Sequence, residues 1–212
     1  VVRTFIVVLA LCALGSSPTF AQQNSGPPLS EPRIPRVERP WTEAQREILE
    51  PREGRNGRLL GVWSTCAQAP DLCQAWLGFT DYLLRESTLP LRDRELLIMR
   101  IGYLNHGAYE WAAHRGIAGR AGISDEELLR ITVGPDADGW STWDAALLRA
   151  ADELHNDALI SDTTWATLAG RYDTRQLMEA VFTVGQYNLV AMYLNSLGVQ
   201  FEEGFEGPPV PD

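Results

Sequence analysis

Apolar residues recur with helical spacing along most of the chain from Trp41 onward. Amphipathic helices place apolar side chains at i, i+3, i+4 and i+7, and no stretch shows the alternation of a half-buried strand. The spacing predicts an all-α bundle that forms a single domain. The predicted helices cover about residues 42–50, 59–65, 71–85, 91–105, 108–121, 124–131, 141–156, 161–168 and 174–197.

Polar residues mark where several of these helices begin. A Ser, Thr or Asp followed three residues later by Gln or Glu forms a capping box. The pairs are Thr42 with Gln45, Ser124 with Glu127, and Asp173 with Gln176. In the predicted helix 91–105, apolar residues nearly encircle the axis, which indicates burial in the core or at a subunit interface.

The N-terminal segment has the features of a secretory signal. Arg3 precedes an apolar run that is too short to span a bilayer, and Thr19-Phe20-Ala21 resembles a cleavage site. We therefore predict a signal peptide at 1–21, a Pro-rich linker or arm at 22–40, the helical domain at 41–200 and a mobile acidic tail at 201–212. Export to the periplasm or the medium is expected, without membrane attachment after cleavage; an uncleaved anchor is the alternative.

Charge and composition exclude some kinds of chemistry. The net charge of −10 argues against nucleic acid as a partner, because a phosphate backbone requires a basic surface. All 18 basic residues are Arg, so a Schiff-base lysine is excluded. Cys66 and Cys73 remain after the signal, and an oxidising compartment favours a disulfide between them. A redox-active pair is the weaker alternative, because six intervening residues do not place both thiols on one helical turn.

The residues that can carry chemistry cluster between positions 91 and 114. Glu110 and His114 are spaced i, i+4 and so share one helix face. A carboxylate beside an imidazole can orient the ring and hold a proton near neutral pH. Glu95 would approach this pair if the two helices form an antiparallel hairpin. The alternative is a solvated Glu–His pair without function.

A metal site is not expected. His106, Glu110 and His114 are spaced i, i+4, i+8, but ligands along one helix would span about 12 Å and could not meet one ion. His155 lies near a predicted helix end, where its charge would interact favourably with the helix dipole.

Several stretches resemble the carboxymuconolactone decarboxylase family of the AhpD-like superfamily, over about residues 41–200. They are Arg92-Asp93-Arg94-Glu95-Leu96-Leu97-Ile98, Tyr109-Glu110-Trp111-Ala112-Ala113-His114, Ala121-Gly122-Ile123-Ser124-Asp125-Glu126-Glu127, Phe182-Thr183-Val184-Gly185-Gln186-Tyr187-Asn188 and Asn195-Ser196-Leu197-Gly198-Val199. The resemblance implies an all-α fold and assembly into trimers or hexamers. Seven Trp also suggest more apolar surface than a small monomer hides, so a homo-oligomer is expected.

The resemblance argues against a thiol peroxidase. In the AhpD-like branch, a Cys-x-x-Cys pair lies between the conserved Glu and His; those positions fall here on Gly107 and Glu110, so both thiols are absent. The branch without these cysteines fits better. It implies a lyase-like enzyme that acts on a small organic acid or lactone without a cofactor.

The implied mechanism assigns a role to each candidate residue. His114 would donate or shuttle the proton, Glu110 would orient the His114 ring, and Glu95 would assist this pair. The expected substrate-binding residues are Tyr109 through its hydroxyl, and Arg94 or Arg100 through bidentate contact with a carboxylate. The alternatives are a thiol-based antioxidant that cycles Cys66 and Cys73, and a non-catalytic oligomeric protein that binds small molecules.

Overall fold

Helix α5 (Leu91–Leu104) forms the centre of the fold in a computed structural model that describes residues 29–209. Every residue from Asp93 to Tyr103 is buried, as the apolar positions around this helix predict. The predicted signal peptide lies outside the described residues. Helix α5 packs against α6 (Ala108–Arg120), α8 (Thr142–Asp157) and α10 (Thr174–Leu197), and also contacts α7 (Asp125–Val133).

The structure between residues 29 and 209 contains helices and no strand, which confirms the predicted all-α class. The capping boxes predicted at Thr42, Ser124 and Asp173 are all formed, and Gly198 ends α10 in the left-handed conformation. Helix α9 (Asp162–Ala169) connects α8 to α10. Within the described part of the chain, no helix has the length and hydropathy needed to cross a bilayer.

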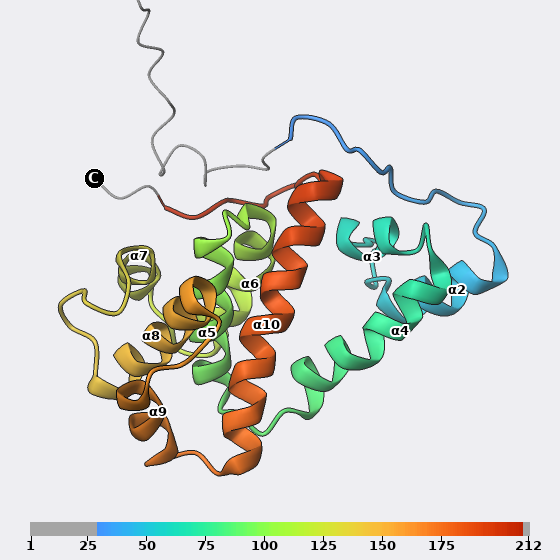
Figure 1. Ribbon diagram of the computed structural model, residues 1–212. Coiled ribbons are helices and arrows are strands. Elements are labelled where there is room, and N and C mark those ends of the chain that lie inside the picture. Colours follow the sequence, from blue (N-terminus) through green and yellow to red (C-terminus); the bar gives the residue numbers. More distant parts are fainter. Residues whose placement is uncertain (1–28, 210–212) are drawn as a thin grey trace, which may run out of the picture.

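The N-terminal helices form a separate layer. In Figure 1, α10 stands between this layer and the helices α5 to α9. The layer consists of α2 (Glu43–Leu49), the 3₁₀ turn η1 (Glu50–Arg52), α3 (Gly61–Cys66) and α4 (Pro70–Asp81). It has its own small core, built from Ile48, Leu49, Ala67, Cys73 and Leu77.

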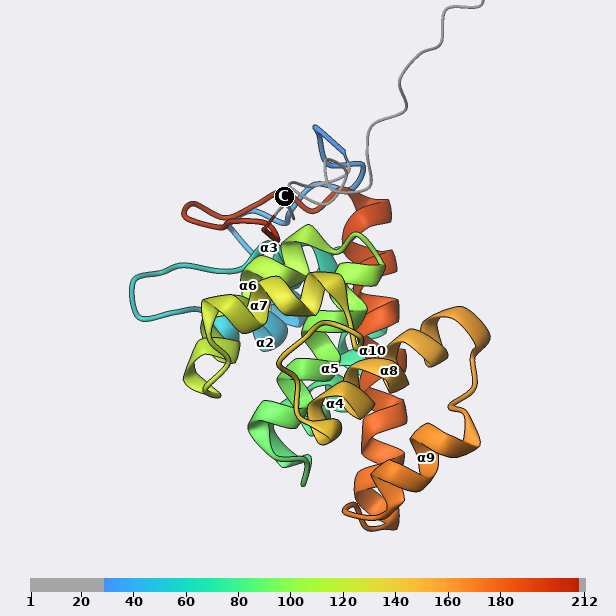
Figure 2. The same cartoon turned by 90° about the vertical axis from the view of Figure 1, so that its left-hand side faces the viewer.

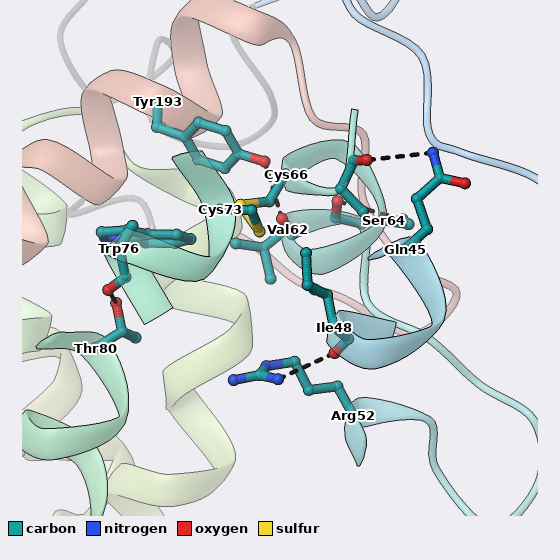
Figure 3. Close-up of a disulfide and its surroundings, with 12 residues drawn as sticks. Gln45, Ile48, Arg52, Val62, Ser64, Cys66, Cys73, Trp76, Thr80 and Tyr193 are labelled. Atoms are coloured by element: carbon teal, nitrogen blue, oxygen red, sulfur yellow. Dashed lines mark hydrogen bonds between the residues drawn. A yellow bond between two sulfur atoms is a disulfide. The ribbon is translucent and has the colours of Figure 1, made fainter. Parts of the chain in front are cut away.

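A disulfide joins Cys66 at the end of α3 to Cys73 in the first turns of α4 (Figure 3), with 5.4 Å between their Cα atoms. The sequence predicts that this helix continues to Arg85, but the regular α-helix ends at Asp81. Residues Tyr82–Glu86 form a π-helical turn, η2. Arg94 donates to the carbonyl oxygens of Leu84 at 2.7 Å and Leu83 at 3.4 Å, so this turn presents its carbonyls to α5.

The extended arm and the tail lie together at one end of the bundle (Figure 2). The backbone amides of Arg33 and Ile34 donate to the carbonyl of Leu197, at the end of α10. Arg36 donates both terminal nitrogens to the carboxylate of Glu202, at 3.1 and 3.0 Å. Residues 202–209 therefore pack against the domain, whereas the sequence favoured a mobile tail.

Candidate active site

Glu95 on α5 and His114 on α6 meet in the interior. Glu95 Oε2 lies 2.8 Å from His114 Nδ1, and both side chains are buried. Burial opposes ionisation of Glu95, but hydrogen bonds and charge from His114 and Arg94 outweigh it and lower the pKa of the carboxyl. An ionised carboxylate only accepts hydrogen bonds, so Nδ1 of His114 carries the hydrogen. Nε2 is then the nitrogen that can exchange a proton with a ligand.

The sequence assigned the wrong carboxylate to His114. Glu110 makes no hydrogen bond to the ring, although the two residues are one turn apart on α6. Side chains on a helix tilt toward its N-terminus, so Glu110 reaches away from His114 and toward the end of α5. There its carboxyl lies over Gly102, where an added Cβ would be 2.8 Å from Glu110 Oε1. The correct partner of His114 is Glu95.

Glu110 is a buried carboxyl without a protein partner. Its residue exposure is 2%, and neither carboxyl oxygen has a hydrogen-bond partner. Burial, with the nearby charge of Glu95 as a second cause, raises the pKa of Glu110 well above its ordinary value. Its surroundings therefore favour the uncharged carboxylic acid over the carboxylate.

Glu110 and His114 line an apolar cavity of about 150 Å³ between α3, α4, α6 and α10. Its wall contains the aromatic residues Trp63, Trp76, Tyr109 and Tyr187. The Tyr187 ring stands perpendicular to the His114 ring, with 5.0 Å between their centroids. No Arg is among the lining residues, so the cavity offers a bound molecule no full positive charge from Arg. It suits a small ligand with a largely apolar surface.

The disulfide lies behind the aromatic wall of this cavity. Trp76 packs between Trp63 and Tyr193, with centroid distances of 5.9 and 5.7 Å. Figure 3 shows Trp76 and Tyr193 beside Cys66 and Cys73, and the Tyr193 hydroxyl donates to the Val62 carbonyl at 2.9 Å. The cysteines are not among the cavity-lining residues. The disulfide thus fixes the two helices that carry the wall, and its sulfur atoms do not face the cavity.

The three expected substrate-binding residues have other roles. Arg94 is buried and binds Glu95 Oε1 through Nε and Nη2, at 3.2 and 3.0 Å, so its guanidinium supports the Glu95–His114 pair. Arg100 is buried, forms an ion pair with the half-buried Asp152 at 2.6 and 3.0 Å, and lies outside the cavity wall. Neither Arg therefore lies where the sequence analysis expected it, in a position to bind a substrate carboxylate in this cavity.

Tyr109 contributes its ring to the cavity but not a free hydroxyl. The hydroxyl accepts a hydrogen bond from the Val62 amide at 3.3 Å and donates to Glu202 Oε1 at 3.1 Å. Glu202 also accepts from the Gly61 amide at 2.7 Å, so the tail secures the start of α3 to α6. Burial, and next the charge of Glu202, raise the pKa of Tyr109.

Sequence reasoning missed the aromatic wall, above all Trp63, Trp76 and Tyr187. Each occupies an ordinary apolar position of a helix, and the spacing within one helix does not show which face meets a cavity. Within residues 29–209, no group of three or more His, Cys, Asp or Glu is arranged to hold a metal ion.

Residues 70–153 match the sequence profile of the Carboxymuconolactone decarboxylase family. An uncharacterized peroxidase-related protein from Silicibacter sp. TM1040 has a similar structure (TM-score 0.70, 14% identity, 84% of this chain and 97% of that chain covered). An uncharacterized peroxidase-related protein from Ralstonia eutropha JMP134, described as an alkylhydroperoxidase AhpD core, is also similar (TM-score 0.68, 17% identity, 80% of this chain and 93% of that chain covered). No protein with a curated description matches the chain.

The debrominase Bmp8, whose variant was solved in complex with 2,3,4-tribromopyrrole, is also similar (TM-score 0.65, 17% identity, 80% of this chain and 91% of that chain covered). The fold and the matched segment define an AhpD-like helical protein. The match over residues 70–153 and the AhpD-like fold support membership of the carboxymuconolactone decarboxylase/AhpD-like family, and with it a related enzymatic or antioxidant-type function.

Proposed function

We propose that the chain is an acid–base enzyme in which His114 transfers a proton to or from a small ligand in the apolar cavity. The observation that carries this proposal is the buried 2.8 Å contact between Glu95 and His114 Nδ1. His114 also lines the cavity. Glu95 is a positioning residue that fixes the tautomer, and Arg94 keeps Glu95 ionised and in place.

The reaction class is proton transfer at a carbon next to a carbonyl. His114 would take a proton from this carbon at Nε2, which leaves an enolate, and would then return the proton to the carbon. A small lactone suits the cavity better than an acid held by Arg, because no Arg lines the wall. The bromopyrrole bound by the debrominase supports a small planar ring as the ligand. No step requires a cofactor.

Exchange of carbon-bound hydrogen in D₂O tests the proposal directly. A panel of five- and six-membered lactones is incubated with the protein and followed by NMR. We expect exchange with the wild type, a loss of at least about 100-fold in His114→Gln, and a smaller loss in Glu95→Gln. His155→Gln, an exposed histidine on α8 outside the cavity, is the matched control and should behave as wild type. Equal exchange by wild type and His114→Gln would refute the proposal.

An antioxidant-type function is the second candidate, and family membership is the observation that favours it. It would require Cys66 and Cys73 to cycle between disulfide and thiols, although neither lines the cavity. A peroxide-consumption assay on the wild type and Cys66→Ala separates the two functions. Peroxide consumption that depends on Cys66 would favour the antioxidant.

We also propose a homo-oligomer built on α10. An exposed stripe on this helix runs through Met178, Phe182, Gly185, Leu189 and Met192. Successive positions are four, three, four and three residues apart, the spacing of a coiled-coil seam. A second copy of the same stripe is a complementary partner, because a two-fold axis places identical surfaces against each other.

Export remains part of the proposed function. The Cys66–Cys73 disulfide supports a location outside the reducing cytosol, because disulfides persist mainly in oxidising compartments. Cell fractionation tests this, with the periplasmic or secreted fraction expected to hold the protein.

A further inference from the structure

Two residues that line the cavity carry buried polar groups without a protein partner. These groups are the carboxyl of Glu110 on α6 and the indole N–H of Trp76 on α4. Buried polar groups in native proteins are almost always hydrogen-bonded, so an unpaired one calls for an explanation such as a ligand. The two residues belong to different helices and line the same cavity, so a ligand in that cavity is the explanation that covers both.

The sequence around Glu110 makes room for its carboxyl. An added Cβ on Gly102 would lie 2.8 Å from Glu110 Oε1 and 3.3 Å from its Cδ, so a larger residue at this position on α5 would force the carboxyl to move. The three atoms nearest to that added Cβ all belong to Glu110. The absence of a side chain at position 102 therefore leaves the space that the Glu110 carboxyl occupies.

The charges around Glu110 determine which form of the carboxyl is present. Glu95 on α5 is ionised and close enough to disfavour a second negative charge, and Tyr187 faces the same region from α10. His114 on α6 gives its Nδ1 hydrogen to Glu95 and makes no hydrogen bond to Glu110. These surroundings favour the protonated form of Glu110, which carries an O–H and can act as a hydrogen-bond donor.

We propose that Glu110 is a binding residue that donates a hydrogen bond from its uncharged carboxylic acid to a carbonyl oxygen of a small, uncharged cyclic ligand. The indole N–H of Trp76 is a second donor in the same wall. This inference rests on the proposed function and names its substrate class, which is neutral cyclic ketones, enones and lactones. Carboxylates are excluded, because Glu95 is negative and no Arg lines the cavity to compensate a second charge.

Three probes of one shape separate these classes. They are 2-cyclohexen-1-one, which has an acceptor oxygen, cyclohexene, which has none, and 1-cyclohexene-1-carboxylate, which is an anion. Binding is measured by calorimetry at pH 7 on the full chain. We expect the enone to bind at least about 10-fold more tightly than either of the others, the ratio that one hydrogen bond typically supplies.

Variants assign the effect to Glu110. Glu110→Leu should weaken enone binding about 10-fold and leave cyclohexene binding within about twofold, whereas Glu110→Gln keeps an N–H donor and should stay close to wild type. Enone binding that is unchanged in a folded Glu110→Leu protein overturns the inference. So does equal or tighter binding of the carboxylate by wild type, or failure of wild type to bind the enone.

Infrared difference spectroscopy gives a second measurement if Glu110→Leu does not fold. The difference between wild type and Glu110→Gln at pH 7 should contain the C=O stretch of a protonated carboxyl, and the enone should shift it. Absence of that band overturns the inference. Glu110-dependent binding without proton exchange would refute the proposed function alone, and His114-dependent exchange without an effect of Glu110 would refute this inference alone.

Discussion

The effect of replacing Gly102 by Ala on the stability of the protein should depend strongly on the side chain at position 110. In the wild type the new methyl group would lie 2.8 Å from Glu110 Oε1, closer than unbonded carbon and oxygen atoms approach. Overpacking of this kind costs about 1–3 kcal/mol. The same change raises helix propensity by about 1 kcal/mol, because alanine is a better helix former than glycine. We therefore expect Gly102→Ala to destabilise the wild type by up to about 2 kcal/mol.

The effect of Gly102→Ala on the free energy of unfolding should change sign when Glu110 is replaced by a shorter residue. In a Glu110→Ala background the three atoms nearest to the new methyl group are gone, so only the gain in helix propensity remains. Gly102→Ala should then stabilise by about 0.5–1 kcal/mol. The coupling between the two positions is expected at about 1–3 kcal/mol, as is usual for residues in contact.

Urea and thermal unfolding of the four proteins at one fixed concentration measure this coupling. One kcal/mol corresponds to about 2–4 °C in Tm for a domain of this size. Gly78→Ala is the matched control, since Gly78 is on α4 with open space around it and should show the propensity gain alone. Effects of Gly102→Ala and Glu110→Ala that add within about 0.5 kcal/mol would refute the steric argument.

Three further predictions concern stability and assembly. Cys66→Ser should destabilise the protein by about 2–3 kcal/mol, as expected for a short disulfide loop, and a melting temperature equal to wild type would contradict this. Burial opposes ionisation of Glu179, but hydrogen bonds from Tyr82, Arg175 and Thr88 outweigh it and lower the pKa to about 2. Glu179→Gln should therefore cost about 1–3 kcal/mol at pH 7, and this difference should disappear as the pH falls from 4.5 toward 2; a constant difference would count against it. Phe182→Asp should convert the oligomer to a monomer in analytical ultracentrifugation, and an unchanged sedimentation mass would exclude the α10 stripe as the interface.

The helices could be predicted from the sequence because their signals are local. The capping boxes at Thr42, Ser124 and Asp173 depend on residues three positions apart, and each formed as expected. The all-round apolar pattern of residues 91–105 indicated a buried central helix, which α5 is. Such signals survive folding because neighbouring helices do not alter them.

The site was harder to predict because it depends on contacts between helices. Glu95 and His114 are 19 residues apart and meet only through the packing of α5 on α6. The i, i+4 spacing of Glu110 and His114 places them on one face but does not give the direction of either side chain. Arg94 was expected to bind a ligand, yet the π turn at Leu83 and Leu84, which accepts its hydrogen bonds, has no clear sequence signal.

The matched family segment supplies only part of the cavity. Glu95, Glu110 and His114 lie within residues 70–153, whereas Leu60, Val62 and Trp63 precede it and Tyr187, Val190 and Leu194 follow it. The shape of the cavity therefore depends in part on stretches of the chain outside the matched segment. Substitutions in α3 or in the second half of α10 can reshape the cavity without altering the Glu95–His114 pair, so related chains with the same pair can accept different molecules.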